Sequence, residues 1–473
     1  MPTDLWRLSA TDLAAKIRAQ EVSSLEVIEA HLARIDAVNP AVNAITVVLA
    51  DEARESAVIA DEAIAAGEDV GPLHGVPMTI KENVDLAGSP TTQGVPAMAN
   101  AVPLQDAPSI AHLKNAGAIP IGRTNMPDFG LRWHTDNDLR GPTKNPWDPT
   151  RTPGGSSGGD AAALALGMTP LGNGNDLGGS VRWPSQCCGV TALRPTLGRV
   201  ASASDLAAAD APIGFQLMGV QGPMARHVKD LRLALEIMSQ PDARDPWWTP
   251  APLQGPTSSA PLRVALAVDP GGAGTDPHVA EAVRSAGRAL AEAGYEVEEV
   301  DPPAVLELQA NWQQLVIDEI NEFSRPAMEP IVSKAALQFL NLWTQVTESL
   351  DHAAYMRGYG TRKSLAREWS LFQEQYPLVV GPVSAQQPFK VGYDVAGPDE
   401  VAAHILAMRL TIAINDLGLP SVALPVGTAD IEGVEFPQGV QIIGQRYRED
   451  RCLDAAEAVE QSLGRIAPID PRG

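Results

Sequence analysis

Between residues 73 and 196, short apolar runs with the composition of β-strands alternate with segments of helical periodicity, such as residues 109–116. Strands that alternate with helices are joined by crossover connections, which favour a mostly parallel sheet covered by helices. The pattern therefore predicts an α/β fold. It also places two glycine-rich segments at junctions between elements, where backbone amides are free to meet a ligand.

The first junction contains Ser180, in the run Asn-Asp-Leu-Gly-Gly-Ser-Val-Arg between an extended segment at 169–176 and a predicted helix at 181–189. Backbone N–H groups at a helix start lack partners, and glycines allow such amides to approach a ligand closely. The amides that could together stabilise a developing oxyanion belong to Leu177, Gly178, Gly179 and Ser180. Taken alone, the segment fits a glycine-rich turn capped by Ser180 equally well.

The second junction is Pro-Gly-Gly-Ser-Ser-Gly-Gly at 153–159, which contains Ser156 and Ser157 and precedes an alanine-rich helical run at 160–167. A flexible linker is one alternative, but linkers seldom lead at once into an apolar helix. A phosphate-binding loop is another, but the chain has no G-x-x-x-x-G-K-[ST] motif. The segment therefore favours a fixed loop.

Lys81 ends an apolar extended stretch at 75–80, which could carry its side chain into the interior. Burial disfavours an ammonium group, so a desolvated lysine has a lowered pKa and can act as a general base near neutral pH. A single lysine beside a strand is more often solvated. The presence of the two serine segments in the same chain favours a catalytic role for Lys81.

Together these segments resemble the amidase signature family, whose members hydrolyse amides with a Ser–Ser–Lys triad. The resemblance rests on Gly-Gly-Ser-Ser-Gly-Gly at 154–159, on Gly-Gly-Ser-Val-Arg at 178–182, and on the spacing of 24 between Ser156 and Ser180. Further similar stretches lie at 73–85, 117–125, 141–148, 188–196, 222–238, 417–427 and 437–444. The resemblance implies an α/β fold over residues 1–473: a single large α/β/α domain with a central mixed, mostly parallel sheet flanked by helices.

The resemblance also assigns roles to the residues. It implies that Ser180 is the nucleophile that forms an acyl-enzyme, that Ser156 bridges it to Lys81 as general base, and that the Gly155–Ser156 peptide is cis. Ser157, adjacent to Ser156, is expected to be a cap or a support. Asp176 and Arg182 flank the nucleophile turn and are expected to brace it as an ion pair.

The loop at 130–138 corresponds to a stretch that lies against the acyl pocket in the family. The resemblance therefore makes its first residues, Gly130, Leu131, Arg132 and Trp133, candidates for substrate binding. Trp133 could stack on a substrate ring, and Arg132 could pair with a carboxylate. A surface or packing role is an equal alternative for each.

Composition limits the partners. The formal net charge of −23 disfavours nucleic acid and anionic membranes.

The three cysteines do not form a disulfide framework, and the N-terminus lacks the pattern of a secretion signal, so the sequence predicts a cytoplasmic protein. No apolar run is long enough to cross a bilayer. The eight scattered histidines form no metal motif, so neither a metal nor another cofactor is expected.

The chain divides into segments within the one domain. Residues 1–70 read as amphipathic helices, including 24–38 and 53–66, and residues 71–240 form the catalytic core segment. A proline-rich stretch at 241–261 reads as an exposed connection. The second half, 262–473, begins with a predicted β–α–β unit at 262–300 and contains a helical section at about 304–375 that the resemblance places over the cleft.

Three functions are weighed. The favoured one is an amidase that hydrolyses the carbon–nitrogen bond of a small linear, aryl or cyclic amide. The second is the glutaminase subunit of a tRNA-dependent amidotransferase, which would need partner subunits. The third is a non-catalytic binding protein on the same scaffold, although all three triad residues are present. A homodimer is expected from the resemblance alone.

Overall fold

The structure is a computed structural model that describes residues 4–206, 210–257 and 260–472. Eleven strands of this described chain join in one sheet, in the order β1-β3-β2-β4-β6-β5-β10-β11-β9-β7-β8. The strands are β1 (Ile45–Val48), β2 (Pro77–Lys81), β3 (Ile119–Thr124), β4 (Leu171–Asp176), β5 (Thr191–Arg194), β6 (Val220–Ala225), β7 (Arg263–Leu266), β8 (Glu296–Glu299), β9 (Leu378–Gly381), β10 (Ser421–Ile431) and β11 (Val434–Gly444). The α-helices are α1 (Ala10–Arg18), α2 (Ser24–Val42), α3 (Ala50–Ala66), α4 (Pro108–Asn115), α5 (Gly158–Ala165), α6 (Arg182–Cys188), α7 (Ile213–Met218), α8 (Val228–Met238), α9 (Pro277–Glu292), α10 (Val305–Glu319), α11 (Arg325–Met328), α12 (Lys334–Gln345), α13 (His352–Gln375), α14 (Pro398–Ala407), α15 (Arg409–Leu417) and α16 (Glu449–Leu463).

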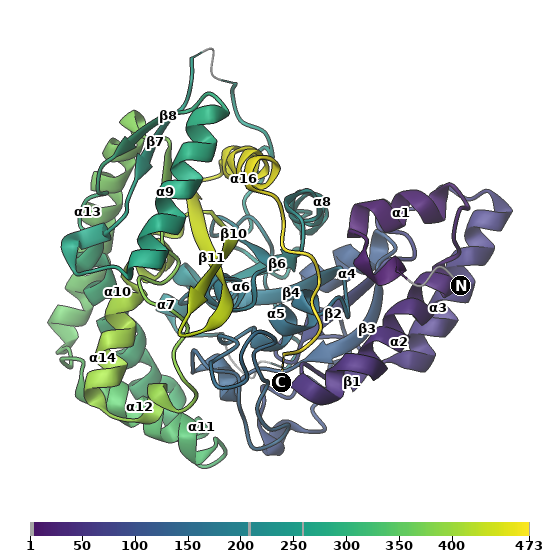
Figure 1. The fold of residues 1–473 in the computed structure, drawn as a ribbon. Coiled ribbons are helices and arrows are strands. Elements are labelled where there is room, and N and C mark those ends of the chain that lie inside the picture. Colours follow the sequence, from purple (N-terminus) through teal and green to yellow (C-terminus); the bar gives the residue numbers. More distant parts are fainter. Residues whose placement is uncertain (1–3, 207–209, 258–259, 473) are drawn as a thin grey trace.

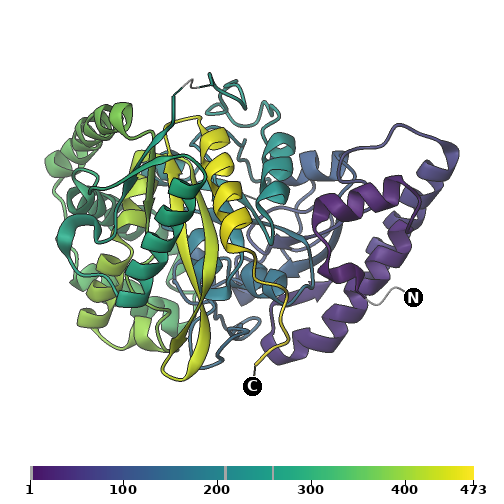
Figure 2. The same cartoon turned by 45° about the horizontal axis from the view of Figure 1, so that its top comes forward.

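Helices cover both faces of the sheet, as the α/β/α prediction requires. Successive side chains of a strand point to opposite faces. In β10, Val422 and Leu424 join the apolar core beneath α4, α8, α9 and α16, whereas Ala423 joins the core that contains α5 and α6. Figures 1 and 2 show α1–α3 at one end of the molecule and α10–α14 at the opposite end.

The sheet is mixed, but the expectation that it is mostly parallel is wrong. Within the described chain, parallel pairing joins β2 to β3 and β4, and β7 to β8 and β9. The strands between these two groups pair antiparallel, from β4 through β6, β5, β10 and β11 to β9. The alternation of strands and helices in the sequence therefore predicts the strand directions of these two groups well and those in the middle of the sheet poorly.

A tight hairpin explains part of this difference. Strands β10 and β11 are joined by Glu432 and Gly433, whose φ angles are 55° and 85°. Two consecutive positive φ angles match the twist of a two-residue β-hairpin, which forces the strands to run antiparallel. Residues 417–427 and 437–444, which the resemblance marks, contribute to these two strands.

The predicted N-terminal helices are confirmed, and local chemistry explains where α2 begins. The Ser23 side chain accepts a hydrogen bond from the Glu26 amide, and the Glu26 carboxylate accepts one from the Ser23 amide. This capping box satisfies two helix-start donors. Buried Val27, Ile28 and Leu32 then follow at helical spacing, so α2 packs its apolar side on the core.

The second half also agrees with the prediction in its main elements. The expected β–α–β unit is β7, α9 and β8, and the section at 304–375 is mainly helical. The predicted connection at 241–261 contains no helix or strand where it is described, and residues 258–259 lie outside the described residues. No helix of the described chain has the length and apolar character needed to cross a membrane.

A buried ion pair fixes the loop that follows β5 to the start of α16. Arg199 Nη2 and Glu449 Oε2 are 3.0 Å apart, and both side chains are buried. The other carboxylate oxygen of Glu449 accepts the Thr196 amide at 2.9 Å. The pair therefore holds a segment whose Leu197 and Gly198 line the large cavity described below.

We expect Glu449→Gln to lower the free energy of unfolding by about 3 kcal/mol or more, because it leaves the Arg199 guanidinium buried without its counter-charge. Glu299→Gln is the matched control, since the Arg284–Glu299 pair, 3.4 Å apart, is largely exposed and is expected to contribute less than about 1 kcal/mol. Chemical denaturation of the two variants measures the difference. Equal losses would contradict this account of the buried pair.

Candidate active site

Lys81 lies at the end of β2, and Asp176 lies at the end of β4. These strands are parallel neighbours, so their carboxyl ends meet at the same edge of the sheet. The chain leaves β4 directly into the Ser180 turn and then enters α6. Edges formed by the carboxyl ends of parallel strands are common ligand sites, and this edge brings the three expected triad residues into one region.

The Lys81 side chain is fully buried, as the sequence predicted. Its Nζ donates to Ser156 Oγ at 2.6 Å and to Asn175 Oδ1 at 2.8 Å. Burial lowers the pKa of Lys81 to about 7, although the nearby carboxylates of Asp160 and Asp176 oppose this shift. A lysine in this state can hold or release a proton near neutral pH.

The loop that carries Ser156 is fixed by close backbone packing. A Cβ atom on Gly155 would lie 2.5 Å from the Arg132 carbonyl oxygen, so only glycine fits there. The Gly155–Ser156 peptide is cis, as the resemblance implied. The next residue, Ser157, donates its amide to the Ser180 carbonyl at 3.1 Å, whereas its hydroxyl has no hydrogen-bond partner in the described chain. Ser157 therefore supports Ser180 through its backbone and is no side-chain cap.

In the turn that carries Ser180, every backbone carbonyl from Asp176 to Ser180 accepts a hydrogen bond. The donors are Arg194 Nη1 to Asp176 O at 2.7 Å, Trp312 Nε1 to Leu177 O at 3.0 Å, Trp133 Nε1 to Gly178 O at 2.8 Å, Trp183 N to Gly179 O at 2.7 Å, and Ser157 N to Ser180 O at 3.1 Å. Each carbonyl is thus held from the protein side. The amides in the same peptide groups as the first four of these carbonyls are those that were expected to meet an oxyanion.

Three of the four predicted oxyanion donors are free in this structure. The amides of Leu177, Gly178 and Ser180 have no acceptor among the described residues. The Gly179 amide differs, because it donates to Asp176 Oδ1 at 2.9 Å. Gly179 serves the turn in another way: its φ of +95° suits glycine, and a Cβ there would lie 2.5 Å from Thr411 Cγ2.

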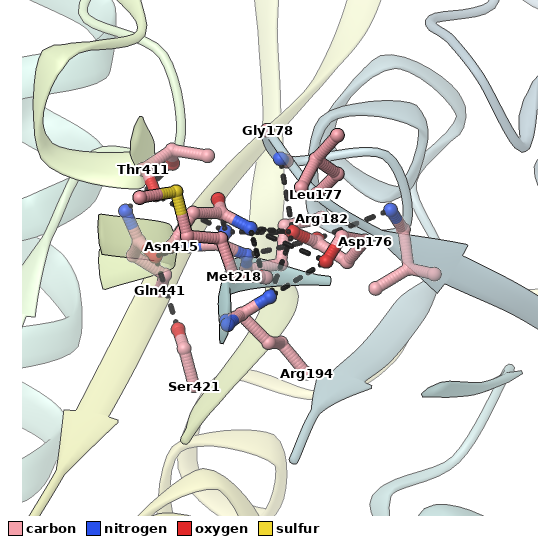
Figure 3. A network of polar contacts seen from close by, with 12 residues as sticks. Asp176, Leu177, Gly178, Arg182, Arg194, Met218, Thr411, Asn415, Ser421 and Gln441 are labelled. Atoms are coloured by element: carbon pink, nitrogen blue, oxygen red, sulfur yellow. Dashed lines mark hydrogen bonds and ion pairs between the residues drawn. The ribbon is translucent and has the colours of Figure 1, made fainter. Parts of the chain in front are cut away.

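The expected brace between Asp176 and Arg182 is present and belongs to a larger buried network (Figure 3). Arg182 Nη2 lies 3.0 Å from Asp176 Oδ1, and Arg194 Nη1 lies 3.5 Å from the same atom. Asn415 Nδ2 also donates to Asp176 Oδ1, at 2.8 Å. Burial alone would raise the pKa of Asp176, but the two guanidinium groups outweigh it and hold this pKa below its ordinary value. The turn is therefore anchored by a carboxylate that stays ionised.

A cavity of about 640 Å³ opens over this turn. Ser156, Asn175 and Ser180 are in its wall, while Lys81 lies behind Ser156. Ser180 is 8% exposed and Ser156 is 2% exposed. Within the described residues no hydrogen bond joins the two serine hydroxyls, so the link between them is their shared cavity wall.

The predicted substrate-binding loop contributes less to the cavity than expected. Gly130 lines the cavity, and Leu131 is half-buried. The Arg132 guanidinium forms a buried, two-pronged ion pair with Asp394, at 2.8 and 3.0 Å, which favours the packing alternative over pairing with a substrate carboxylate. The Trp133 ring is buried among other aromatic rings and does not line the cavity, which favours the packing alternative over stacking on a substrate ring.

Aromatic residues elsewhere line the cavity and escaped the sequence-based reasoning. Phe129, Phe215 and Trp247 are in its wall, and Trp247 is 47% exposed. Trp247 comes from the stretch predicted as an exposed connection, and it is held by a hydrogen bond from its Nε1 to Gln216 Oε1 at 3.0 Å. The Trp-Trp pair in a proline-rich stretch was the available signal, because exposed connections seldom carry two tryptophans.

Asp160 is a second group that matters for the lysine. It lies in the first turn of α5, is fully buried, and accepts a hydrogen bond from Thr79 Oγ1 at 3.3 Å. Burial raises the pKa of Asp160, while Thr124 and the nearby Lys81 oppose that rise. The two side chains therefore influence each other's protonation, and the negative form of Asp160 favours the protonated form of Lys81.

The chain is similar to known proteins over most of its length. The family model described as Amidase matches residues 26–453. An indoleacetamide hydrolase of Bradyrhizobium diazoefficiens is 44% identical over 98% of this chain and 88% of its own length. A subunit of the glutamyl-tRNA(Gln) amidotransferase of Moorella thermoacetica is 33% identical over 97% of each chain. The solved structure of a 6-aminohexanoate cyclic dimer hydrolase with its substrate superposes with a TM-score of 0.83, at 26% identity over 99% of this chain and 100% of that one.

We expect Asp160→Asn to lower the pKa of Lys81 further, because it removes a negative charge that favours the ammonium form. NMR titration of protein labelled with ¹³C at the lysine ε-carbons measures this pKa directly, and Lys81→Met identifies the resonance. In the unsubstituted protein this resonance is expected to titrate near pH 7. A rise of the pKa in Asp160→Asn, or no change, would contradict the coupling between the two side chains.

Proposed function

The chain belongs to the amidase family, and we propose that it hydrolyses a small arylacetic primary amide through an acyl-enzyme formed on Ser180. As a member of this family it is an amidohydrolase that acts on carbon–nitrogen bonds other than peptide bonds. The observation that carries the proposal is the 2.6 Å hydrogen bond from buried Lys81 to Ser156, in the cavity wall that also contains Ser180.

In the proposed mechanism, neutral Lys81 accepts a proton from Ser156 while Ser156 accepts one from Ser180. The Ser180 oxygen then attacks the carbonyl carbon of the substrate amide. The substrate's carbonyl oxygen becomes negative and is stabilised by the free amides of the turn. The proton returns along the same path to the leaving nitrogen, which departs as ammonia. Water repeats the sequence at the acyl-enzyme, so that a carboxylic acid leaves and Ser180 recovers its proton.

The cavity supports an aromatic substrate. Its volume of about 640 Å³ lies within the range of small-molecule sites. Phe129, Phe215 and Trp247 offer aromatic surface on its wall, and edge-to-face or offset ring contacts stabilise an aromatic ligand. The name of the relative at 44% identity, indoleacetamide hydrolase, fits this chemistry. We therefore propose indoleacetamide and related arylacetamides as the first substrates to test.

Two alternatives predict different behaviour. A glutaminase subunit of a tRNA-dependent amidotransferase is represented by relatives at lower identity, 33% against 44%, and such a protein would need partners for its reaction. A non-catalytic binding protein would keep the scaffold without turnover. The intact set of Lys81, Ser156 and Ser180 favours catalysis over the second alternative.

The cysteines bear on where the enzyme acts. Cys187, Cys188 and Cys452 are buried and unpaired, and burial raises the pKa of the Cys188 thiol, which keeps it unreactive. Free thiols of this kind fit the reducing cytoplasm, where we propose that the protein acts. A homodimer is proposed from the family resemblance.

Purified protein is expected to release ammonia from indoleacetamide without partner proteins, and Ser180→Ala is expected to abolish this turnover because it removes the attacking oxygen. Glutamine, anilides and cyclic amides serve as comparison substrates. Ser156→Ala is expected to lower kcat by several orders of magnitude. Ser157→Ala is the matched control, since its hydroxyl makes no hydrogen bond in the described chain, and activity within a few-fold of the unsubstituted enzyme is expected.

Turnover of glutamine that appears only with added partner proteins would instead support the amidotransferase alternative. No turnover of any amide would support the binding protein. Equal losses in Ser156→Ala and Ser157→Ala would mean that the relay through Ser156 is wrong.

The pH dependence of kcat/KM is expected to follow the protonation of Lys81. Only the neutral amine accepts a proton, so below its pKa of about 7 the active fraction falls tenfold for each pH unit, and above it kcat/KM levels off. The profile is measured with arylacetamide substrate between pH 5 and 9. A profile that stays flat down to pH 5 would remove Lys81 from the role of general base, and Lys81→Ala with normal turnover would do the same.

A further inference from the structure

Two buried tryptophans, one from each half of the chain, hold consecutive peptide groups of the nucleophile turn. Trp312, on α10, donates its indole N–H to the Leu177 carbonyl at 3.0 Å. Trp133, in the loop after β3, donates to the Gly178 carbonyl at 2.8 Å. Both indoles are buried, at 2% and 5% exposure, and neither lines the cavity.

The geometry of the peptide bond gives these contacts a consequence. In a trans peptide the C=O and N–H groups point in opposite directions within one plane. A donor that fixes the Leu177 carbonyl therefore fixes the direction of the Gly178 amide, which is one of the free amides. The peptide group from Gly178 to Gly179 is held at both ends, because Trp133 binds its carbonyl and Asp176 accepts its amide at 2.9 Å.

Packing holds the two indoles in these positions. Trp133, Trp312 and Trp343 form a cluster in which ring centroids are 5.6 to 6.4 Å apart, and Phe339 packs edge-on against Trp133. A Cβ atom on Gly178 would lie 2.7 Å from Trp312 Cζ2. The glycine is thus required for the indole to reach the carbonyl beside it.

We propose that Trp312 is a positioning residue of the oxyanion hole, which aims the free Gly178 amide by holding the Leu177 carbonyl behind it, and that Trp133 steadies the next peptide group of the same turn. This inference rests on the proposed function, since the amides have this role only if an acyl-transfer oxyanion forms here. In this proposal α10 supplies one of the two indole donors to the nucleophile turn. Because both rings lie outside the cavity wall, their N–H groups affect the transition state and leave substrate binding unchanged.

The test replaces each indole by a ring without an N–H donor. Trp312→Phe is expected to lower kcat for indoleacetamide by about tenfold or more, with KM within about twofold of the unsubstituted value. Trp133→Phe is expected to lower kcat less, because Asp176 still holds the Gly179 amide. Direct loss of an oxyanion donor lowers kcat by about 10² to 10³, so a smaller effect is expected when the donor is only misdirected. The double variant is expected to approach that larger loss.

Trp343→Phe is the matched control. Trp343 stacks on Trp312, with ring centroids 5.6 Å apart, and its indole nitrogen has no hydrogen-bond partner in the described chain. The substitution therefore removes the same volume from the same cluster without removing a bond to the turn. Its kcat is expected to stay within about threefold, and thermal unfolding of all three single variants measures their stability separately from kcat.

The outcomes separate clearly. Equal kcat losses in Trp312→Phe and Trp343→Phe would overturn the proposal, because packing alone would then explain the effect. A rise in KM with unchanged kcat would also overturn it, since the rings would then act on substrate binding. If the unsubstituted protein hydrolyses no amide, the proposed function has failed, and the indole hydrogen bonds are then left with a purely structural role.

Discussion

The hydrogen bond from a fully buried Lys81 to Ser156 is the interaction on which the rest of the site depends. A lysine can be buried at the end of β2 only because Ser156 and Asn175 accept its hydrogens and because burial lowers its pKa to about 7. The same burial makes the amine available as a base at neutral pH. The burial of Lys81 is thus the cause both of its structural cost and of its use as a base.

The nucleophile turn has to accommodate the negative charge of an oxyanion. Its own carbonyls would repel an oxyanion, and each one from Asp176 to Ser180 is directed into the protein by a donor. The ionised carboxylate of Asp176, paired with Arg182 and Arg194, anchors the start of the turn. The amides of Leu177, Gly178 and Ser180 are left without an acceptor in the described chain, and the carbonyls behind them are held before any substrate arrives.

Much of this was predictable from the sequence, because the chemistry is concentrated in short segments. The burial of Lys81, the cis Gly155–Ser156 peptide and the Asp176–Arg182 pair were expected and are present. The predicted helices and strands of both halves are also largely confirmed. The parallel character of the sheet was overestimated, because β10 and β11 form a tight hairpin and because their pairings with β5 and β9 span large sequence separations that local patterns do not report.

The wall of the cavity was predicted less well. Trp133 was expected to meet the substrate, yet its partner is a backbone carbonyl 45 residues along the chain, which no local pattern reveals. Trp247 was assigned to an exposed connection, although tertiary packing brings it to the cavity. Side chains of long loops depend on contacts with distant segments, so substrate specificity is the part of the site that sequence describes least.

The most direct measurement of the central claim is to trap the covalent intermediate. Protein that is turning over indoleacetamide, or an activated ester of the same acid, is quenched in acid and digested, and the peptides are examined by mass spectrometry. The account predicts that the acyl group is found on Ser180 and is absent from the Ser180→Ala protein. An acyl group on Ser156 or Ser157, or turnover that continues in Ser180→Ala, would contradict it.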